Sequence, residues 1–266
     1  MELEKIKVAA FQFHGSGNIE DNFFSLERGI IKAAKQNVRL LITQECALCG
    51  YPPVELDKTN SINFDIINES LLSFKKMAIE KNMYIALGTI NFFNNKYFNS
   101  VELISPNQKK LIPYSKRALW GWDTQNFIPG DNNRGIYQID GFKIGIRICY
   151  EVRFPEYFRE LFKEDVFLAL ISFCDVGEEN QLPKYELIKS HLITRAVENA
   201  MYIMSVNSIS NHQLAPTCLI NPDGVVLHTS PQNEEYLFTY VIERDKSNFG
   251  RDGRIKHSKE LLGIFT

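Results

Sequence analysis

A carboxylate, an amine and a thiol follow three apolar segments that are typical of β-strands. Glu45 comes after VRLLITQ, Lys116 after LIPYS, and Cys149 after FKIGIRI. In α/β proteins, the ends of strands are where side chains from distant parts of the chain meet. If these three meet, the carboxylate can take the thiol proton and the thiolate can attack a carbonyl-like carbon. The ammonium group can then stabilise the oxyanion that develops.

A nucleophilic Cys149 needs partners, because a free cysteine thiol titrates at about 8.5 and is mostly protonated at neutral pH. The chain has five histidines, the usual partners of such a cysteine, but none carries a local signature of a cysteine protease. Glu45 and Lys116 are the alternative, and we expect the backbone N–H of Tyr150 to help to hold the oxyanion. Taken singly, Cys149 would be a packed core thiol and the other two would be surface charges.

The elements that must position these residues alternate between strand and helix. Apolar residues recur at helical spacing over residues 18–36, 64–82, 157–164 and 184–200. Strand-like segments separate them, and several are joined as hairpins, for instance around Asp140-Gly141 and 221–224. This mixture predicts an α/β fold in which two mixed β-sheets pack face to face with helices outside. No linker divides the chain, so we expect a single domain over residues 1–266, with a core at about 5–243 and a polar tail over 246–266 that is mobile unless it docks.

The composition excludes several classes of protein. The 266 residues carry a formal net charge of -2 without a dense block of Lys and Arg, so we expect neither nucleic acid nor a membrane surface as a partner. No apolar run approaches the length of about 18 residues that spans a membrane, and the first residues do not resemble a signal peptide. Five cysteines, an odd number, argue against a disulfide framework. We therefore expect a reduced, cytoplasmic protein.

Three segments resemble the motifs of one known family. TQECALCGYPP, YSKRALW and GIRICYEVRFPE resemble the glutamate, lysine and cysteine motifs of the carbon–nitrogen hydrolase (nitrilase) superfamily, in the right order. Supporting similarities are YFNSVELIS, FIPGDN, HLITRAVENAMYIMSVN and NPDGVVL, so that the resemblance covers about residues 5 to 243.

The resemblance implies a four-layer αββα sandwich that commonly dimerises, with no metal and no organic cofactor. It implies that Glu45 is the general base, that Lys116 stabilises the oxyanion, and that Cys149 is the nucleophile. The reaction would be hydrolysis of a non-peptide C–N bond through a thioester. The amidase-like form of the cysteine motif favours a small linear amide and release of ammonia, with an N-carbamoyl compound as the alternative substrate.

The chain departs from the family pattern in one place that bears on activity. Relatives usually carry a second glutamate shortly before the Pro-Gly that follows the lysine motif, and we place that position at Gln125, an uncharged residue. Asp123 lies two residues away and is a weaker candidate to replace the missing charge. If nothing replaces it, the protein would be a weakly active paralogue that binds a metabolite.

The surroundings of the triad are less specific. Seven further residues are expected to line the substrate pocket: Tyr51, Asp123, Gln125, Glu151, Arg153, Phe173 and Cys174. Arg153 suits a substrate carboxylate, although an ion pair with Glu151 or Glu156 is the favoured interpretation.

Cys46 and Cys49 form a C-x-x-C pair that we interpret as buried thiols, since a zinc site would need two more ligands and a redox pair is the weaker alternative. The sequence leaves open whether an amide, a carbamoyl compound or a nitrile is the substrate.

Overall fold

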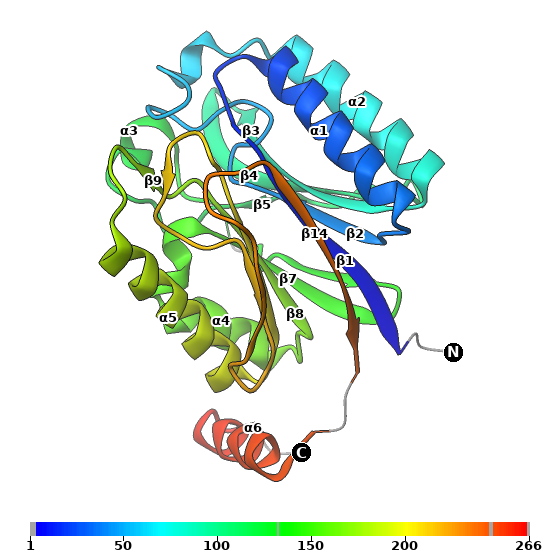
Figure 1. The fold of residues 1–266 in the computed structure, drawn as a ribbon, viewed down its shortest axis with the longest axis vertical. Helices are drawn as coiled ribbons and strands as arrows, with labels where there is room; N and C mark the ends of the chain where they lie inside the picture. The colour runs from blue at the N-terminus through cyan, green and yellow to red at the C-terminus, as the bar shows by residue number, and fades with distance from the viewer. Residues whose placement is uncertain (1–3, 132, 245–246, 265–266) are drawn as a thin grey trace.

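The computed structural model describes residues 4–131, 133–244 and 247–264. Two six-stranded β-sheets face each other, and helices cover their outer faces (Figure 1). The first sheet has the order β14-β1-β2-β3-β4-β5. Its strands are β1 (Lys5–Gln12), β2 (Leu40–Thr43), β3 (Tyr84–Phe93), β4 (Lys96–Ile104), β5 (Tyr114–Ser115) and β14 (Tyr236–Glu243). β1, β2 and β3 run parallel, and the other pairs are antiparallel.

The second sheet repeats this mixed design in the order β13-β12-β10-β8-β7-β6. Its strands are β6 (Ile136–Ile139), β7 (Phe142–Ile148), β8 (Leu168–Phe173), β10 (Tyr202–Asn207), β12 (Cys218–Ile220) and β13 (Val226–Thr229). β7, β8 and β10 are its parallel strands. A small antiparallel pair joins β9 (Val176–Gly177) to β11 (His212–Gln213).

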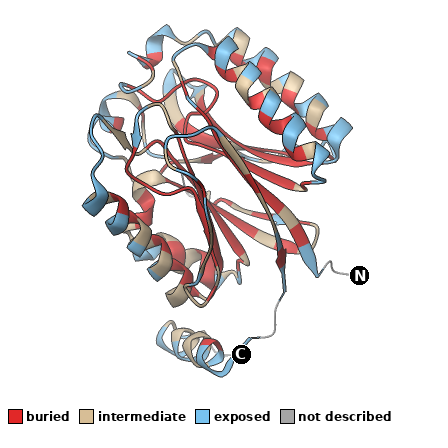
Figure 2. Ribbon diagram, in the orientation of Figure 1, coloured by how far each residue is buried: buried red, intermediate tan, exposed pale blue. Residues whose placement is uncertain are grey.

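Helices form the two outer layers. α1 (Ile19–Lys35) and α2 (Phe64–Lys81) cover the first sheet, while α4 (Pro155–Lys163) and α5 (Leu182–Asn199) cover the second (Figure 1). Three short helices lie in connections: η1 (Thr59–Ser61), α3 (Asp123–Asn126) and η2 (Cys149–Arg153). The central strands β2, β8 and β10 are buried along their whole length, whereas β13 and β14 are partly exposed (Figure 2). The predicted four-layer αββα sandwich is therefore confirmed.

Local sequence explains where the covering helices begin and end. The side chain of Asn18 accepts hydrogen bonds from the backbone N–H groups of Glu20 and Asp21, and Asn63 caps α2 in the same way. Such caps satisfy N–H groups that have no acceptor inside the helix. α2 ends at Asn82, whose left-handed backbone (φ 49°) turns the chain into β3.

Two segments differ from the prediction. The segment 110–115, expected to be a strand, pairs only at Tyr114–Ser115, and Pro113 immediately before it has no N–H to donate. The C-terminal tail, for which the sequence predicted no helix and left docking open, forms a helix, α6 (Phe249–Leu261), which docks through Arg251 and Arg254 on Asp223 at 2.6 and 2.9 Å. Residues 246, 265 and 266 of that tail lie outside the described residues.

The carboxyl ends of β2 and β8 lie close together, at the contact between the two sheets. The hydroxyl of Ser172, near the end of β8, donates to the carbonyl of Thr43 at the end of β2. The N–H of Glu45 donates to the carbonyl of Phe173. These bonds fasten the end of one sheet to the end of the other. None of the helices in the described residues is long and apolar enough to cross a membrane.

A glycine allows the turn after β2 to lie against β3. A Cβ atom added to Gly88 would lie 1.9 Å from the carbonyl oxygen of Gln44, the residue before Glu45. We expect Gly88→Ala to displace this turn and to lower the free energy of unfolding by about 1–3 kcal/mol, as overpacking does elsewhere. Chemical denaturation measures the change. The control is Gly253→Ala in α6, where an added Cβ meets nothing within 4 Å and stability should not fall. Equal stability of the two variants would contradict this reading of the turn.

Candidate active site

Cys149 is the first residue of η2, directly after β7. Its backbone is left-handed (φ 45°), which is unusual for a residue with a side chain and makes the strand turn sharply. The thiol is free, and the residue keeps some exposed surface. The N–H of Tyr150 lies in the first turn of this short helix, where backbone N–H groups have no intrahelical acceptor. Its part in an oxyanion hole stays a prediction.

Glu45 is fully buried, and both of its carboxylate oxygens have partners. Oε1 accepts hydrogen bonds from Lys116 Nζ and from Asn99 Nδ2, each at 2.7 Å. Oε2 accepts from the backbone N–H of Cys174 at 2.8 Å. The carboxylate is therefore held between β4, β5 and the end of β8, and it cannot swing freely.

Lys116 is also fully buried, and it lies between two carboxylates. Its Nζ is 2.7 Å from Glu45 Oε1 and 2.7 Å from Asp123 Oδ2. Its backbone is fixed as well, because its N–H donates to the carbonyl of Asn99 and its carbonyl accepts from Gly130. A buried ammonium requires such pairing, since an unpaired charge in the interior is strongly destabilising.

Asp123, rather than Gln125, supplies the second carboxylate beside the lysine. Besides Lys116, Asp123 accepts from the hydroxyl of Tyr51 at 2.6 Å and from the N–H of Trp120 at 2.8 Å. Gln125 is exposed on the outside of the short helix α3. The prediction that Gln125 stands where relatives carry the second glutamate was therefore wrong. Asp123, the weaker candidate, supplies the carboxylate beside Lys116. Within one helical turn, residues two apart point in different directions, so only one of them can face the lysine.

Tyr51 was expected as a pocket wall, and it is buried against the triad. Its hydroxyl binds Asp123, and its ring lies 5.8 Å from Lys116 Nζ. Tyr51 thus links the loop after the glutamate motif to the loop after the lysine motif. Asn99 was not singled out from the sequence, although the segment YFNSVELIS that contains it was part of the resemblance.

Glu151 points into the protein and not into a pocket. It is fully buried and accepts hydrogen bonds from the N–H groups of Ile148 and Arg117 and from the hydroxyl of Tyr114, at 2.7–2.8 Å. These contacts join the cysteine turn to the lysine motif. The expectation that Glu151 lines the substrate pocket is not supported by these contacts, and its position explains how two distant motifs keep a fixed separation.

Arg153 makes no ion pair with Glu151 or Glu156 within the part of the chain that the structure describes. Its guanidinium lies over the rings of Trp120 and Tyr150, with distances of 5.9 and 5.7 Å to the ring centroids. The favoured interpretation, an ion pair that fixes the helix start, was wrong. The side chain keeps hydrogen-bond donors that an anion can use.

Phe173 and Cys174 hold the site through their backbones. The carbonyl of Phe173 accepts a hydrogen bond from the N–H of Glu45, and the N–H of Cys174 donates one to the Glu45 carboxylate. The ring of Phe173 packs in the core between the second sheet and its helices. The Phe173 ring therefore does not line a pocket at Glu45. Cys46 and Cys49 are buried free thiols, as interpreted from the sequence.

The charges around Lys116 decide which groups are ionised. Burial alone would lower the pKa of Lys116, but the negative charges around it outweigh burial and raise the pKa well above its ordinary value. Burial raises the pKa of Glu45, with Lys116 opposing the shift. Burial and the charge of Glu45 also raise the pKa of the Cys149 thiol well above its ordinary value. At neutral pH the site therefore holds an ammonium group and a protonated thiol.

This arrangement has the parts that nucleophilic catalysis needs. The Glu45 carboxylate acts electrostatically on the Cys149 thiol. A carboxylate that reaches a thiol can accept its proton during attack, and a fixed cation can stabilise an oxyanion. Within the described residues, no group of three or more His, Cys, Asp or Glu side chains is placed to hold a metal ion.

This chain is similar to known proteins over most of its length. Residues 7–248 match the model of a family described as carbon–nitrogen hydrolase. The chain is 24% identical to a deaminated glutathione amidase of Dictyostelium discoideum, over 91% of this chain and 90% of that protein. It is 27% identical to a 2-oxoglutaramate amidase of Bacillus subtilis, over 86% and 88%. The crystal structure of an amidase from Nesterenkonia sp. shares the fold, with a TM-score of 0.79 and 19% identity over 97% of this chain and 96% of that one.

The raised pKa of the Cys149 thiol predicts how it reacts with an alkylating agent. Only the thiolate reacts, so the rate with iodoacetamide should be low at pH 7 and rise about tenfold per pH unit up to the thiol pKa. The other cysteines are buried and should react only after unfolding. Peptide mass spectrometry locates the label, with Cys149→Ala as control. Fast labelling of Cys149 at a constant rate from pH 6 to 8 would show that the resting site already holds a thiolate.

Proposed function

The chain belongs to the carbon–nitrogen hydrolase family, and on that premise we propose that it hydrolyses a small linear amide through a thioester on Cys149 and releases ammonia. The family and the amidase-like relatives make it a hydrolase of C–N bonds other than peptide bonds. The observation that carries the finer proposal is the buried Lys116, which is held by two carboxylates and interacts electrostatically with Cys149.

In the first half of the reaction, the Cys149 sulfur attacks the amide carbon while Glu45 takes the thiol proton. Lys116 and the N–H of Tyr150 stabilise the oxyanion of the tetrahedral intermediate. The intermediate collapses, the C–N bond breaks, and Glu45 gives its proton to the departing nitrogen, which leaves as ammonia. A thioester between Cys149 and the acyl group remains.

In the second half, water replaces ammonia. Glu45 takes a proton from the water as it attacks the thioester carbon, and the same cation stabilises the new oxyanion. The C–S bond then breaks, the acid leaves, and the sulfur recovers its proton from Glu45. Because Asn99 and the N–H of Cys174 hold the carboxylate in one place, the same group can serve both halves.

The position of Asp123 speaks against the alternative of a weakly active, metabolite-binding paralogue. That alternative depended on the absence of a second carboxylate, and Asp123 provides one at 2.7 Å from Lys116 Nζ. An N-carbamoyl compound remains the second candidate substrate. Exposed Trp120 and Trp122 suit the expected homodimer, which stays a prediction, as does the cytoplasmic location.

Ammonia release tests the reaction. We expect release from at least one member of a panel of small amides, monoamides of dicarboxylic acids and N-carbamoyl amino acids. The rate of ammonia release by Cys149→Ala should be at least about 10³-fold lower than that of the wild type, because the variant cannot form the thioester. Its circular dichroism spectrum should stay unchanged. Nitriles belong in the panel as a counter-test. Wild-type activity in folded Cys149→Ala would end the proposal.

A matched pair of variants tests the second carboxylate. Asp123→Asn removes one charge from Lys116, and we expect kcat/KM to fall by roughly 10²-fold as the cation loses its position. Gln125→Glu adds a charge on an exposed turn, and we expect less than about a twofold change. A large gain in turnover by Gln125→Glu, with little loss in Asp123→Asn, would restore Gln125 as the functional position.

A further inference from the structure

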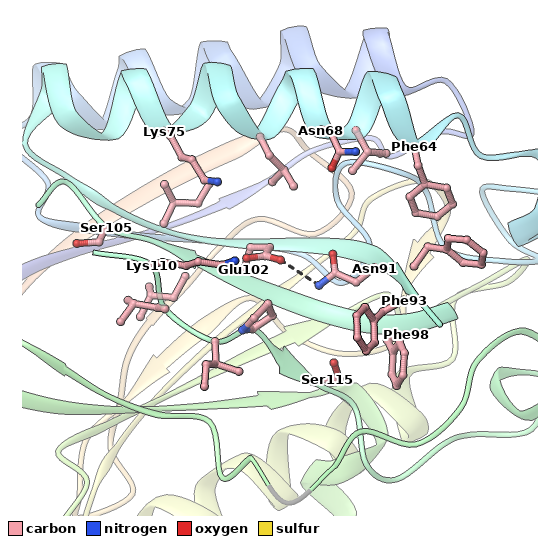
Figure 3. A pocket seen from close by; sticks show the side chains of 18 of the residues that line it. Phe64, Asn68, Lys75, Asn91, Phe93, Phe98, Glu102, Ser105, Lys110 and Ser115 are labelled. Carbon is pink, nitrogen blue, oxygen red and sulfur yellow. Dashed lines mark hydrogen bonds between the residues drawn. The ribbon is translucent and has the colours of Figure 1, made fainter. Parts of the chain in front are cut away.

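The outer face of the first sheet carries a groove that the covering helices leave open. Two helices, each about 10 Å wide, cover about four strands spaced about 4.8 Å apart, and this sheet has six. At the β4–β5 edge, a cavity of about 1290 Å³ lies between α2, the outer face of β4 and residues 108–113 (Figure 3). We call it the α2 groove.

The α2 groove lies apart from the triad. Glu45, Lys116 and Cys149 are not among the residues that line it. Along β4, Glu102 and Ile104 face outward, whereas Val101 and Leu103 belong to the core between the two sheets. A ligand in the groove would therefore leave the triad free, and binding there does not depend on the proposed hydrolysis.

One end of the α2 groove is aromatic. Figure 3 shows Phe64, Phe93 and Phe98 gathered there. The ring centroids of Phe64 and Phe92 lie 5.3 Å apart, and Phe93 is 68% exposed. Rings on a concave surface offer faces and edges on which a planar ligand can stack.

The other end is basic. Lys75 and Lys110 extend into it beside Glu102 (Figure 3), and Lys109, which also lines the groove, precedes Lys110 in the chain. The two lysines act electrostatically on Glu102, which accepts a hydrogen bond from Asn91 at 3.0 Å, but neither forms a direct ion pair within the described residues. Burial raises the pKa of Glu102, and the hydrogen bond from Asn91 and the two lysines oppose that shift.

The charges of the lining do not balance. Four lysines (Lys75, Lys96, Lys109, Lys110) face two acids (Glu102, Asp131). Lys96 pairs with Phe93 at the aromatic end, whereas Lys75, Lys109 and Lys110 belong to the end that holds Glu102. The excess of positive charge at that end, opposite the phenylalanines, matches a ligand with complementary ends. Pockets that bind small molecules are concave, mostly apolar and carry a few convergent polar groups, and the α2 groove has all three properties.

We propose that the α2 groove binds an elongated aromatic anion, with its planar ring against the phenylalanines and its phosphate or carboxylate between Lys75 and Lys110. Asn91 and Glu102 then lie beside the middle of the ligand, where they can hydrogen-bond to hydroxyl or N–H groups. Nucleoside monophosphates and aromatic carboxylates share this chemistry.

The test uses 8-anilinonaphthalene-1-sulfonate, an aromatic anion whose fluorescence rises on binding. We expect one site per folded full-length chain. Lys75→Glu and Phe93→Ser should each weaken binding roughly tenfold, the loss of about one good contact. The matched controls are Lys76→Glu and Phe24→Ser, exposed residues of α2 and α1 that do not line the groove, and they should bind like wild type. Equal melting temperatures would exclude unfolding as the cause.

Displacement of the dye distinguishes the two sources of the ligand. AMP represents nucleotides and indole-3-acetate represents aromatic carboxylates; adenosine and indole are their counterparts without the anionic group. The better displacing anion identifies the source, and its uncharged counterpart should displace roughly tenfold less well.

Three results would overturn the proposal: variants that bind the dye like their controls, displacement by uncharged counterparts as good as by the anions, or displacement by neither anion. A concentration-dependent dimer that Phe93→Ser dissociates in sedimentation would also overturn it, because a second copy of the chain would then fill the groove.

Discussion

The pairing of the buried Lys116 with Glu45 and Asp123 is the interaction on which the site depends. An ammonium in the protein interior is tolerated only where opposite charges surround it, and here the two carboxylates come from separate parts of the chain, each 2.7 Å from Nζ. The lysine therefore couples the end of β2, the end of β5 and the short helix α3. Losing either carboxylate leaves a cation that is poorly compensated and free to move away from a developing oxyanion.

The rest of the fold serves this cluster through backbone and buried side-chain contacts. Asn99 and the N–H of Cys174 fix Glu45 from the two sheets, and Glu151 ties the lysine motif to the cysteine turn. The left-handed backbone of Cys149 then presents the thiol where β7 ends. Because these contacts are internal to the two sheets, the geometry is fixed before any substrate arrives, which is what electrostatic catalysis requires.

Residue types at strand ends and the family resemblance were enough to predict the layered fold, which is confirmed, and to select Glu45, Lys116 and Cys149, whose catalytic roles stay a prediction. They were not enough for Asp123, because counting along an irregular loop does not tell which of two polar residues faces inward. A similar limit applies to Glu151 and Phe173. A polar or aromatic residue beside a reactive one has either a structural or a substrate-binding role, and the structure shows structural contacts for both. The α2 groove could not be predicted from the sequence, because it forms where the two covering helices leave part of a six-stranded sheet uncovered.

The most direct test of the account is whether amide hydrolysis passes through an acyl group on Cys149. The measurement is the ratio of hydroxamate to free acid formed in the presence of hydroxylamine, from a primary amide and from the methyl ester of the same acid. A common thioester predicts the same ratio from both substrates, because the leaving group has departed before the two nucleophiles compete. A ratio that changes with the leaving group, or hydrolysis with no hydroxamate at saturating hydroxylamine, would contradict a covalent intermediate on Cys149.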